Sequence, residues 1–265
     1  SIKEIAKDKK FPILIDEEGG RVTRLSNLIK NTISQKFFGD LYTANKNIGI
    51  TTYRNYTNSI CLSLKDLGIN INTVPVLDLK KNKTHKIIGD RSYSQKVSTI
   101  KILGNVCTDI YKKNQLGTVI KHLPGHGSAK SDSHLKLPIV YNSLTNLKKN
   151  DFQCFKNNSS FFAMTAHILY KKIDSKNVST HSKIIIQDII RKYINYKGLI
   201  ISDDISMKAL KYDIVTNAKK ALNAGCNLVL YCKGKTKESE KLLKSVPYID
   251  QFTKKKTSEF YKFLS

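Results

Sequence analysis

One stretch of the chain, residues 121–138 (KHLPGHGSAKSDSHLKLP), places three histidines, two glycines and an aspartate behind an apolar run. Imidazoles and carboxylates transfer protons near neutral pH, and they also bind zinc. Glycine permits backbone conformations that other residues resist, so this stretch could form an adaptable loop. It is therefore a candidate acid/base loop or metal site, and a basic surface turn is the plainer alternative.

Similar polar clusters follow other short apolar runs: DEEGGR after PILI, TAH after FFAM and SDD after LII. Nearly continuous apolar runs are typical of parallel strands covered on both faces. We expect six such strands, at residues 12–16, 71–79, 117–123, 161–167, 198–204 and 227–232. Segments with helical spacing lie between them, for example residues 94–114 and 180–193, which predicts an α/β fold with a parallel sheet.

The polar clusters fall at the carboxyl ends of nearly all these strands. A (β/α)8 barrel builds its active site at that end of its strands, whereas an open doubly wound sheet binds ligands at its switch point. We therefore predict an α/β (β/α)8 TIM barrel, with residues 1–265 forming a single domain. Six strands instead of eight, and a first residue Ser1 instead of Met, lead us to expect that the first one or two N-terminal βα units are absent.

Composition limits the class of protein. The chain has 265 residues, 40% of them hydrophobic, which is enough for a substantial core. No apolar run reaches the roughly 18 residues of a membrane span. Five cysteines without a CxxC pair indicate reduced thiols rather than a disulfide framework. We expect a cytoplasmic monomer without a membrane partner.

The formal net charge of +25 raises the question of nucleic acid binding. Only five of the 46 basic residues are arginine, the side chain that planar, bidentate recognition favours. The lysines are also spread along the whole chain. We therefore interpret the charge as a solvated lysine surface and predict no nucleic acid partner.

Six motifs occur in order along the chain: ILIDEEGGRVTRL, PVLDL, GDRSYS, KHLPGHG with DSH, MTAH and ISDDISM. Together they closely resemble the β-N-acetylglucosaminidases of glycoside hydrolase family 3, which trim muropeptides in bacterial cell-wall recycling. The resemblance runs from about residue 11 to residue 234. It implies a retaining exo-hydrolase that needs no cofactor and no metal, and that acts on N-acetylglucosamine-containing muropeptides or chito-oligosaccharides.

The resemblance also assigns catalytic residues. Retaining hydrolysis needs a carboxylate nucleophile, which forms a covalent glycosyl-enzyme intermediate, and a group that first donates and then accepts a proton. Asp203 matches the nucleophile, and it follows an apolar run that would hold it at a strand end. His134 matches the proton donor, and Asp132 matches the acidic partner that orients it and favours its charged form.

The same resemblance assigns substrate binding to Asp16, which matches the carboxylate that binds hydroxyls of the terminal sugar, and to a ring of polar residues around it: Arg24, Arg91, Lys121 and His122. Adjacent residues of a strand point to opposite faces, so Lys121 and His122 can both serve one site only if the strand bends. A bulge or turn is therefore predicted there. His167 of MTAH is a further binding candidate, and a sugar contact and a structural role are both open for it.

Other interpretations remain open. His122, His126, Asp132 and His134 could be the ligands of a metal-dependent hydrolase, or the chain could be an inactive sugar-binding or nucleic-acid-binding relic. The plainer role for His126 is a loop histidine bonded to the backbone. Two further aspartates are expected to be structural, at the end of the strand in PVLDL and at the start of a helix over DISMKAL.

Overall fold

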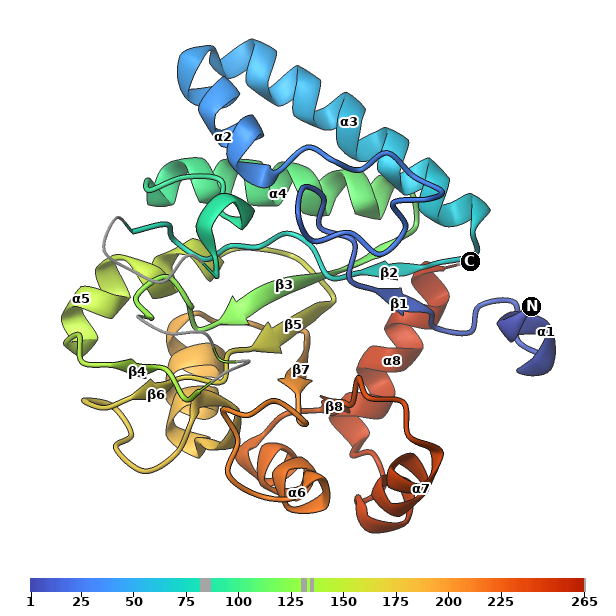
Figure 1. Ribbon diagram of the computed structural model, residues 1–265, viewed down its shortest axis with the longest axis vertical. Coiled ribbons are helices and arrows are strands. Elements are labelled where there is room, and N and C mark those ends of the chain that lie inside the picture. The colour runs from blue at the N-terminus through green and yellow to red at the C-terminus, as the bar shows by residue number, and fades with distance from the viewer. Residues whose placement is uncertain (82–86, 130–132, 134–135, 265) are drawn as a thin grey trace.

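The computed structural model describes the chain over residues 1–81, 87–129, 133 and 136–264. Within these residues, one parallel sheet has the strand order β1-β2-β3-β5-β7-β8 (Figure 1). Its strands are β1 (Leu14–Ile15), β2 (Ile71–Asn72), β3 (Gly117–Leu123), β5 (Phe162–Thr165), β7 (Leu199–Asp204) and β8 (Leu228–Leu230). Each predicted strand contains one of these, so the α/β class and the parallel sheet are confirmed.

A second, two-stranded parallel sheet was not expected from the sequence. It pairs β4 (Ile139–Val140) with β6 (Leu169–Tyr170). Both strands are only two residues long, so neither shows the alternation or the extended apolar run by which a strand is recognised.

Helices connect the strands, as the alternation predicted. They are α1 (Ile2–Ile5), α2 (Gln35–Ala44), α3 (Lys46–Asp66), α4 (Val97–Lys113), α5 (Leu144–Lys149), α6 (Ile214–Ala224), α7 (Thr236–Ser245) and α8 (Gln251–Phe263), with a π-helix η4 (Ile185–Tyr193) and the 3-10 turns η1 (Gly89–Arg91), η2 (Asp151–Phe155) and η3 (Ser179–His181). Helices α2, α3 and α4 stack on one side of the sheet, and α6 and α7 lie near β7 and β8 (Figure 1). None of the helices in the described part of the chain is long and apolar enough to cross a membrane.

Side chains that alternate along the strands belong to two apolar clusters. Ile120, Ala163 and Ile200 pack into the larger cluster, together with residues of α3 and α4. Their chain neighbours Val119 and Phe162 pack into a second cluster inside the curl of the sheet. Burial on both faces explains the continuous apolar runs in the sequence.

The sheet is curled, but within the described residues it does not close, because β1 and β8 are its two edges. Helix α8 covers part of its inner side with Phe260, which is 2% exposed. The Phe260 ring lies 4.9 Å from the ring of Phe162, and a Cβ on Gly117 would meet it. These contacts fall at the amino ends of the strands, which leaves the carboxyl ends free to form a site.

Candidate active site

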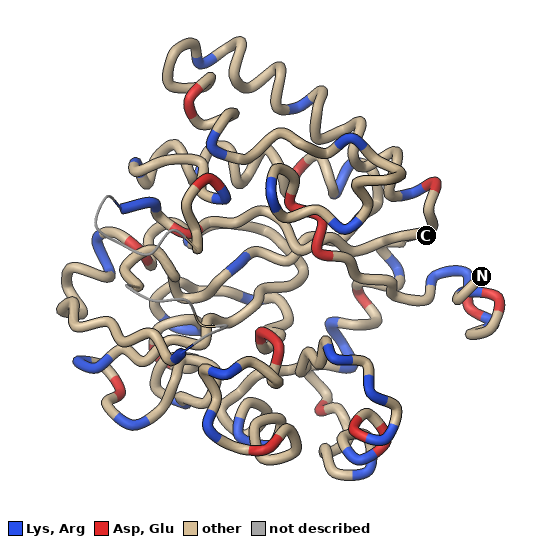
Figure 2. Tube along the Cα trace, in the orientation of Figure 1, with Lys and Arg blue, Asp and Glu red and all other residues tan. Residues whose placement is uncertain are grey.

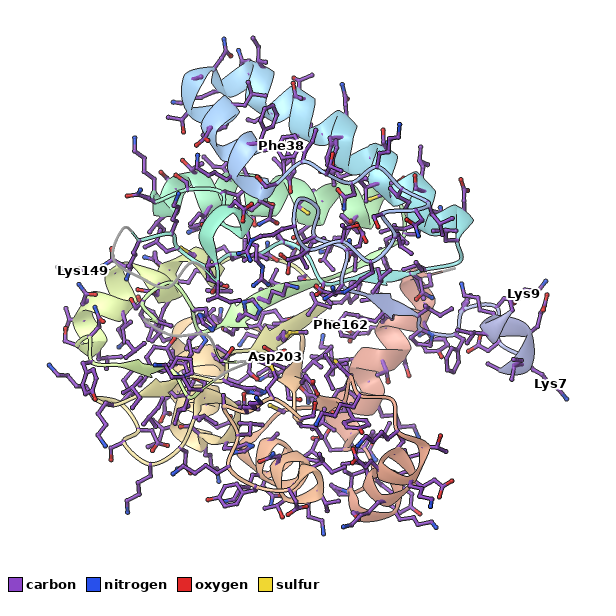
Figure 3. All side chains as sticks on the ribbon, viewed as in Figure 1. Lys7, Lys9, Phe38, Lys149, Phe162 and Asp203 are labelled. Atoms are coloured by element: carbon purple, nitrogen blue, oxygen red, sulfur yellow. The ribbon has the colours of Figure 1, made fainter. Side chains whose placement is uncertain are left out.

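A cavity of about 570 Å³ opens at the carboxyl ends of the strands. Its lining includes six of the residues that the sequence assigned to the site: Asp16, Arg24, Arg91, Lys121, His122 and Asp203. Asp203 lies near the middle of the molecule, at the end of β7 (Figure 3). Strand ends from distant parts of the chain therefore converge on one volume large enough for a sugar.

The proposed acid/base pair, Asp132 and His134, lies outside the described residues. Ser133, between them in the chain, is described and is 4% exposed in the wall of the cavity. Its carbonyl oxygen accepts a hydrogen bond of 3.2 Å from the backbone of Ala209, in the segment after β7.

Lys121 occupies the centre of an ionic cluster in the cavity wall. Its Nζ atom lies 2.5 Å from Asp16 Oδ1 and 2.6 Å from Glu18 Oε1, and it donates to Thr73 Oγ1 at 2.8 Å. Burial opposes ionisation of Asp16, but the charge and hydrogen bond of Lys121 outweigh it and hold the pKa of Asp16 well below its usual range. Asp16 is therefore a fixed carboxylate that can accept hydrogen bonds from a ligand.

Glu18 completes this cluster, although no role was predicted for it from the sequence. It accepts two hydrogen bonds from Arg91, from Nε at 2.7 Å and from Nη2 at 2.6 Å, which is bidentate geometry. Although burial favours the neutral acid, Lys121 and Arg91 hold the pKa of Glu18 below its usual value. Arg24 is more exposed and pairs with Asp16 Oδ2 at 3.2 Å, at the rim of the cavity.

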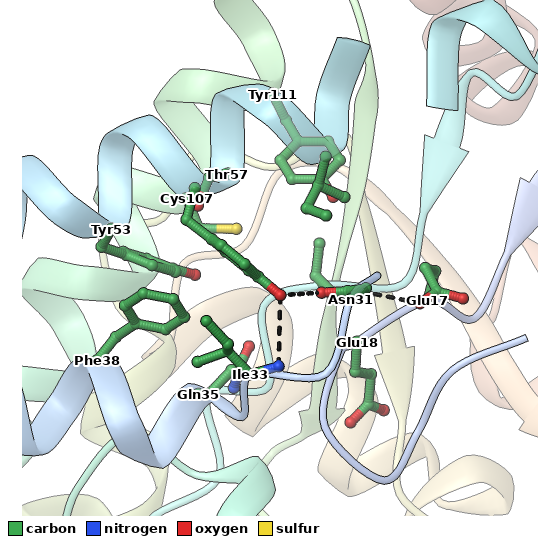
Figure 4. Close-up of a pocket in the computed structure, with 13 residues that line it drawn as sticks. Glu17, Glu18, Asn31, Ile33, Gln35, Phe38, Tyr53, Thr57, Cys107 and Tyr111 are labelled. Carbon is green, nitrogen blue, oxygen red and sulfur yellow. Dashed lines mark hydrogen bonds between the residues drawn. The ribbon is translucent and has the colours of Figure 1, made fainter. Parts of the chain in front are cut away.

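The neighbouring Glu17 is not among the lining residues of this cavity, and Figure 4 shows it at a different pocket. It accepts hydrogen bonds from the backbone N–H groups of Arg24 at 2.6 Å and Leu25 at 3.0 Å, and from Asn31 Nδ2 at 2.8 Å. Glu17 thereby holds the loop that carries Arg24. A second cavity beside it measures only about 30 Å³, too little for a sugar ring.

The predicted bend in β3 is confirmed. The register between β3 and β5 shifts between Ile120 and Leu123, and both Lys121 and His122 line the cavity. His122 Nδ1 lies 2.7 Å from Asp78 Oδ2, so Asp78 fixes the orientation of the imidazole.

Asp78 has no exposed surface and holds more than one group. It also accepts the backbone N–H groups of His122, at 3.2 Å and 3.3 Å, and of His126, at 2.6 Å. Burial opposes its ionisation, but His122 outweighs this effect and holds the pKa of Asp78 below its usual value. Asp78 was expected to be structural, but it also orients His122, which lines the cavity. Its position at the end of the apolar run in PVLD is the sequence feature that could have indicated this role.

His126 lines the cavity beside His122, with the two ring centroids 5.7 Å apart. Burial lowers the pKa of His126 to about 4, so the ring is neutral near pH 7. Its Nδ1 atom is buried and has no hydrogen-bond partner among the described residues. The backbone N–H of His126 donates to Asp78 Oδ1, and the expected bond between the His126 side chain and the backbone is not made through Nδ1.

Asp203 is the carboxylate at the end of β7. Its Oδ1 atom accepts the backbone N–H of Asp204 at 2.8 Å. Burial opposes its ionisation, but the imidazoles of His167 and His122 and the Asp204 N–H together hold the pKa of Asp203 below its usual value. Asp203 is thus ionised near neutral pH, as a nucleophile must be.

The structure places His167 behind the cavity wall, not among its lining residues. It is fully buried, and its ring nitrogens contact Thr180 Oγ1 at 2.7 Å and the carbonyl oxygen of Asp204 at 3.0 Å. Asp204 itself is a residue of β7 followed by a turn, so the helix start predicted there is wrong.

The metal-site hypothesis finds no support in the described part of the chain. There, no three His, Cys, Asp or Glu side chains come together as metal ligands. Two of the four proposed ligands, Asp132 and His134, lie outside the described residues.

Comparison with known proteins adds to this geometry. The family model "Glycosyl hydrolase family 3 N terminal domain" matches residues 3–256. A β-hexosaminidase of Mannheimia succiniciproducens is 33% identical over 239 residues, which cover 87% of this chain and 68% of the relative. A β-hexosaminidase of Nitrosomonas eutropha is 31% identical over 225 residues, covering 83% of this chain and 64% of the relative. The chain thus spans about two thirds of the length of these relatives.

Solved structures agree with the sequence matches. NagZ from Neisseria gonorrhoeae, in complex with N-trifluoroacetyl-D-glucosamine, superposes with a TM-score of 0.85 at 26% identity, over 96% of this chain and 73% of that one. A glycoside hydrolase family 3 β-N-acetylglucosaminidase from Paenibacillus gives 0.84 at 26% identity, over 99% of this chain and 51% of that one. With its cavity at the carboxyl ends of a curled parallel sheet and a family match over nearly its whole length, the chain belongs to glycoside hydrolase family 3.

Proposed function

We propose that the protein is a retaining exo-β-N-acetylglucosaminidase, which removes terminal β-linked N-acetylglucosamine through a covalent glycosyl-enzyme intermediate. The observation that carries the proposal is the cavity itself. It joins the carboxylate of Asp203 on β7 to the polar cluster around Asp16, directly after β1, and Lys121, on β3. A nucleophile and a set of sugar-binding groups in one volume are what glycoside hydrolysis requires.

In the first step, an oxygen of Asp203 attacks the anomeric carbon, and the bond to the leaving oxygen breaks. His134 gives its proton to that oxygen, with Asp132 orienting the ring and favouring its charged form. The lowered pKa of Asp203 supports this role, because only the ionised form can attack.

In the second step, water replaces the leaving group. His134, now neutral, takes a proton from the water as the water attacks the anomeric carbon, and Asp203 is released as a carboxylate. Two inversions at the same carbon return the β configuration. His134 ends the cycle protonated, as it began.

The cluster around Lys121 supports binding of a neutral sugar ring. Asp16 is held ionised by Lys121 and can accept hydrogen bonds from two hydroxyls, while Arg91 can donate. Asp78 holds the Nδ1 side of His122, which leaves Nε2 for the sugar. Arg24 is exposed at the rim, which supports a proposed contact with the group attached to the terminal sugar.

We propose N-acetylglucosamine-containing muropeptides or chito-oligosaccharides as substrates and cell-wall recycling in the cytoplasm as the context. The N-trifluoroacetyl-D-glucosamine bound by the gonococcal NagZ structure supports the sugar class. We further propose a monomeric enzyme in which the curled sheet is the greater part of a single (β/α)8-barrel domain. The reaction is proposed to need neither metal nor cofactor, so a chelator should leave the rate unchanged.

The decisive experiment is hydrolysis of a chromogenic β-N-acetylglucosaminide. We expect turnover by the unaltered protein. In Asp203→Ala, kcat should fall by about a thousandfold or more, because the nucleophile stabilises the transition state by bonding to the anomeric carbon. Asp188→Ala, which removes an exposed carboxylate on η4, is the matched control and should keep full activity. NMR of the first product should show the β anomer.

Two results would contradict the proposal. Binding of the sugar without any turnover would favour an inactive sugar-binding protein. Turnover that a chelator abolishes, or that survives in Asp203→Ala, would favour a metal-dependent hydrolase.

A further inference from the structure

A buried hydrogen-bond chain lies directly behind Asp203. His167 has no exposed surface and does not line the cavity, yet both of its ring nitrogens have polar partners. Nε2 lies 3.0 Å from the carbonyl oxygen of Asp204, and Nδ1 lies 2.7 Å from Thr180 Oγ1. The function proposed above uses neither His167 nor Thr180.

The partners of His167 fix the position of its proton. A carbonyl oxygen can only accept, so Nε2 must carry hydrogen and donate to Asp204. Burial lowers the pKa of His167, so the ring is neutral and Nδ1 is left as a lone pair. That lone pair accepts from the hydroxyl of Thr180 at 2.7 Å, which is shorter than the 3.3 Å from the same hydroxyl to the carbonyl oxygen of Ala166. The chain therefore selects a single tautomer.

A second threonine, Thr165, orients the hydroxyl of Thr180. Thr165 Oγ1 lies 2.8 Å from Thr180 Oγ1, and both threonines have no exposed surface. Since the proton of Thr180 points to His167, Thr165 is the donor in this contact. Each group in the chain therefore donates a hydrogen bond to the next. The Thr165 hydroxyl donates to the Thr180 hydroxyl, which donates to His167, which donates to the carbonyl of Asp204.

Asp204 links this chain to Asp203. Its backbone N–H donates to Asp203 Oδ1 at 2.8 Å, so the position of residue 204 sets the orientation of the neighbouring carboxylate. The side chain of Asp204 is also held, because its Oδ1 accepts the backbone N–H of Ser206 at 3.0 Å and of Cys232 at 3.2 Å. The carbonyl of Asp204 is the point at which His167 acts on this turn.

We propose that His167 and Thr180 are positioning residues for the nucleophile: Thr180 holds His167 as the Nε2–H tautomer, and His167 anchors the turn that aims Asp203 at the anomeric carbon. This inference rests on the proposed function, because it assumes that Asp203 attacks the sugar. Neither side chain touches the substrate. Their effect is on the rate of the chemical step and not on sugar binding.

The main test is Thr180→Val, which replaces the hydroxyl by a methyl group of similar size. His167 Nδ1 then loses its donor inside the protein, and the ring is no longer held in place. We expect kcat to fall by about tenfold to a hundredfold, since misplacement of a reacting group costs that much, while KM changes less than about twofold. Thr180→Ser keeps the hydroxyl and should restore kcat.

A second buried threonine provides the matched control. Thr108 on α4 also has no exposed surface and bonds through its hydroxyl to the carbonyl of Gly104, at 3.1 Å, but it does not line the cavity. Thr108→Val should lower the thermal unfolding temperature about as much as Thr180→Val and leave kcat unchanged. An equal loss of kcat in both variants would mean that Thr180 acts only through stability, and it would overturn the inference.

The tautomer can be measured without any variant. In ¹⁵N NMR of the labelled, unaltered protein near pH 7, His167 should show a protonated Nε2 and an unprotonated Nδ1. The opposite tautomer or a doubly protonated ring would overturn the inference even if Thr180→Val fails to fold. If the unaltered protein does not hydrolyse the chromogenic substrate, the proposed function fails. If it does so and Thr180→Val matches it in kcat, only this inference fails.

Discussion

Asp78 and Glu18 show how the cavity wall is organised at the scale of single residues. Each is a buried carboxylate that contacts more than one polar group of the wall, and each is held ionised by the cations or imidazole that it orients. A buried carboxylate of this kind stabilises the fold only while its partners stay in place. The same contacts therefore fix the geometry of the side chains that face the ligand.

Replacing Asp78 by Asn tests this arrangement. The carboxylate accepts from His122 Nδ1 and from two backbone N–H groups, whereas an amide has one acceptor oxygen and would turn an NH₂ group towards a donor. We expect a loss of about 1–3 kcal/mol in the free energy of unfolding and a fall of about tenfold to a hundredfold in kcat/KM. Urea denaturation and steady-state kinetics measure the two effects.

The control for this variant is Asp213→Asn. Asp213 caps α6 and also accepts two backbone N–H groups, but it lies on the surface away from the cavity. Asparagine caps a helix about as well as aspartate, so stability and kinetics should both stay the same. If Asp78→Asn behaved in this way too, Asp78 would have no role in holding His122.

The positions of some site residues could be predicted from the sequence, and those of others could not. Asp16, Lys121 and Asp203 were located correctly at the cavity, because a polar residue after an apolar run lies at a strand end and parallel strands bring such ends together. Glu18 was missed because its partner Arg91 is 73 residues away, and no local pattern reports an ion pair across that separation.

Elements were predictable where the apolar pattern was long. β3 has the bounds expected from its seven-residue run, whereas β1 and β2 are two residues long, since their flanking residues leave the ladder for loops. The helix expected after Asp204 is a turn instead. Asp204 accepts from Ser206 within that turn, a bond that an aspartate makes equally well in a turn and at a helix start.

Two glycines of the loop after β3, Gly125 and Gly127, are required for a more specific reason than flexibility. A Cβ on Gly127 would lie 2.0 Å from the carbonyl oxygen of Leu79, so only glycine allows the loop after β3 to pack against the segment after β2. Gly125 has a φ of +143°, which other residues rarely adopt. Close approach of two backbones depends on tertiary structure, so the sequence alone showed the glycines but not their cause.

Helix α8 should contribute to stability but not to catalysis. Phe260 packs against Phe161 and Phe162 at the amino ends of the strands, opposite the cavity. We expect Phe260→Ala to lower the free energy of unfolding by about 3–5 kcal/mol, because it removes a large buried side chain. At a temperature where the variant remains folded, kcat and KM should match those of the unaltered protein.

A variant of the same helix supplies the comparison. Phe252 is 41% exposed, so Phe252→Ala should cost far less in urea denaturation than Phe260→Ala. A change in kcat for Phe260→Ala in fully folded protein would show that packing inside the curl reaches the cavity, contrary to the separation of the two ends described above.

At the scale of the whole molecule, charge is distributed unevenly between surface and site. Lys and Arg residues lie on elements all around the fold (Figure 2). The acidic residues Asp16 and Glu18 instead meet basic partners in the cavity wall. The net charge of +25 therefore belongs mainly to the solvated surface, where lysines repel one another and favour solubility.

This distribution predicts how stability depends on pH. The pKa values of Asp16, Glu18, Asp78 and Asp203 are lowered in the folded protein, so these groups bind protons more readily once the chain unfolds. Their contribution is complete above the unfolded values near 4 and is lost as the pH falls through the folded values. The thermal unfolding temperature should therefore fall steeply below about pH 4.

Glu18→Gln separates this effect from general acid unfolding. At neutral pH the variant should unfold at a lower temperature, because Arg91 and Lys121 lose a shared buried counter-charge. As the pH falls below about 4, the unaltered protein progressively loses the same interaction, so the difference between the two unfolding temperatures should shrink. Glu240→Gln, at an exposed position on α7, should show no such convergence. A difference that stays constant from pH 7 to pH 3 would mean that Glu18 stabilises the fold by its shape and hydrogen bonds, and not by its charge.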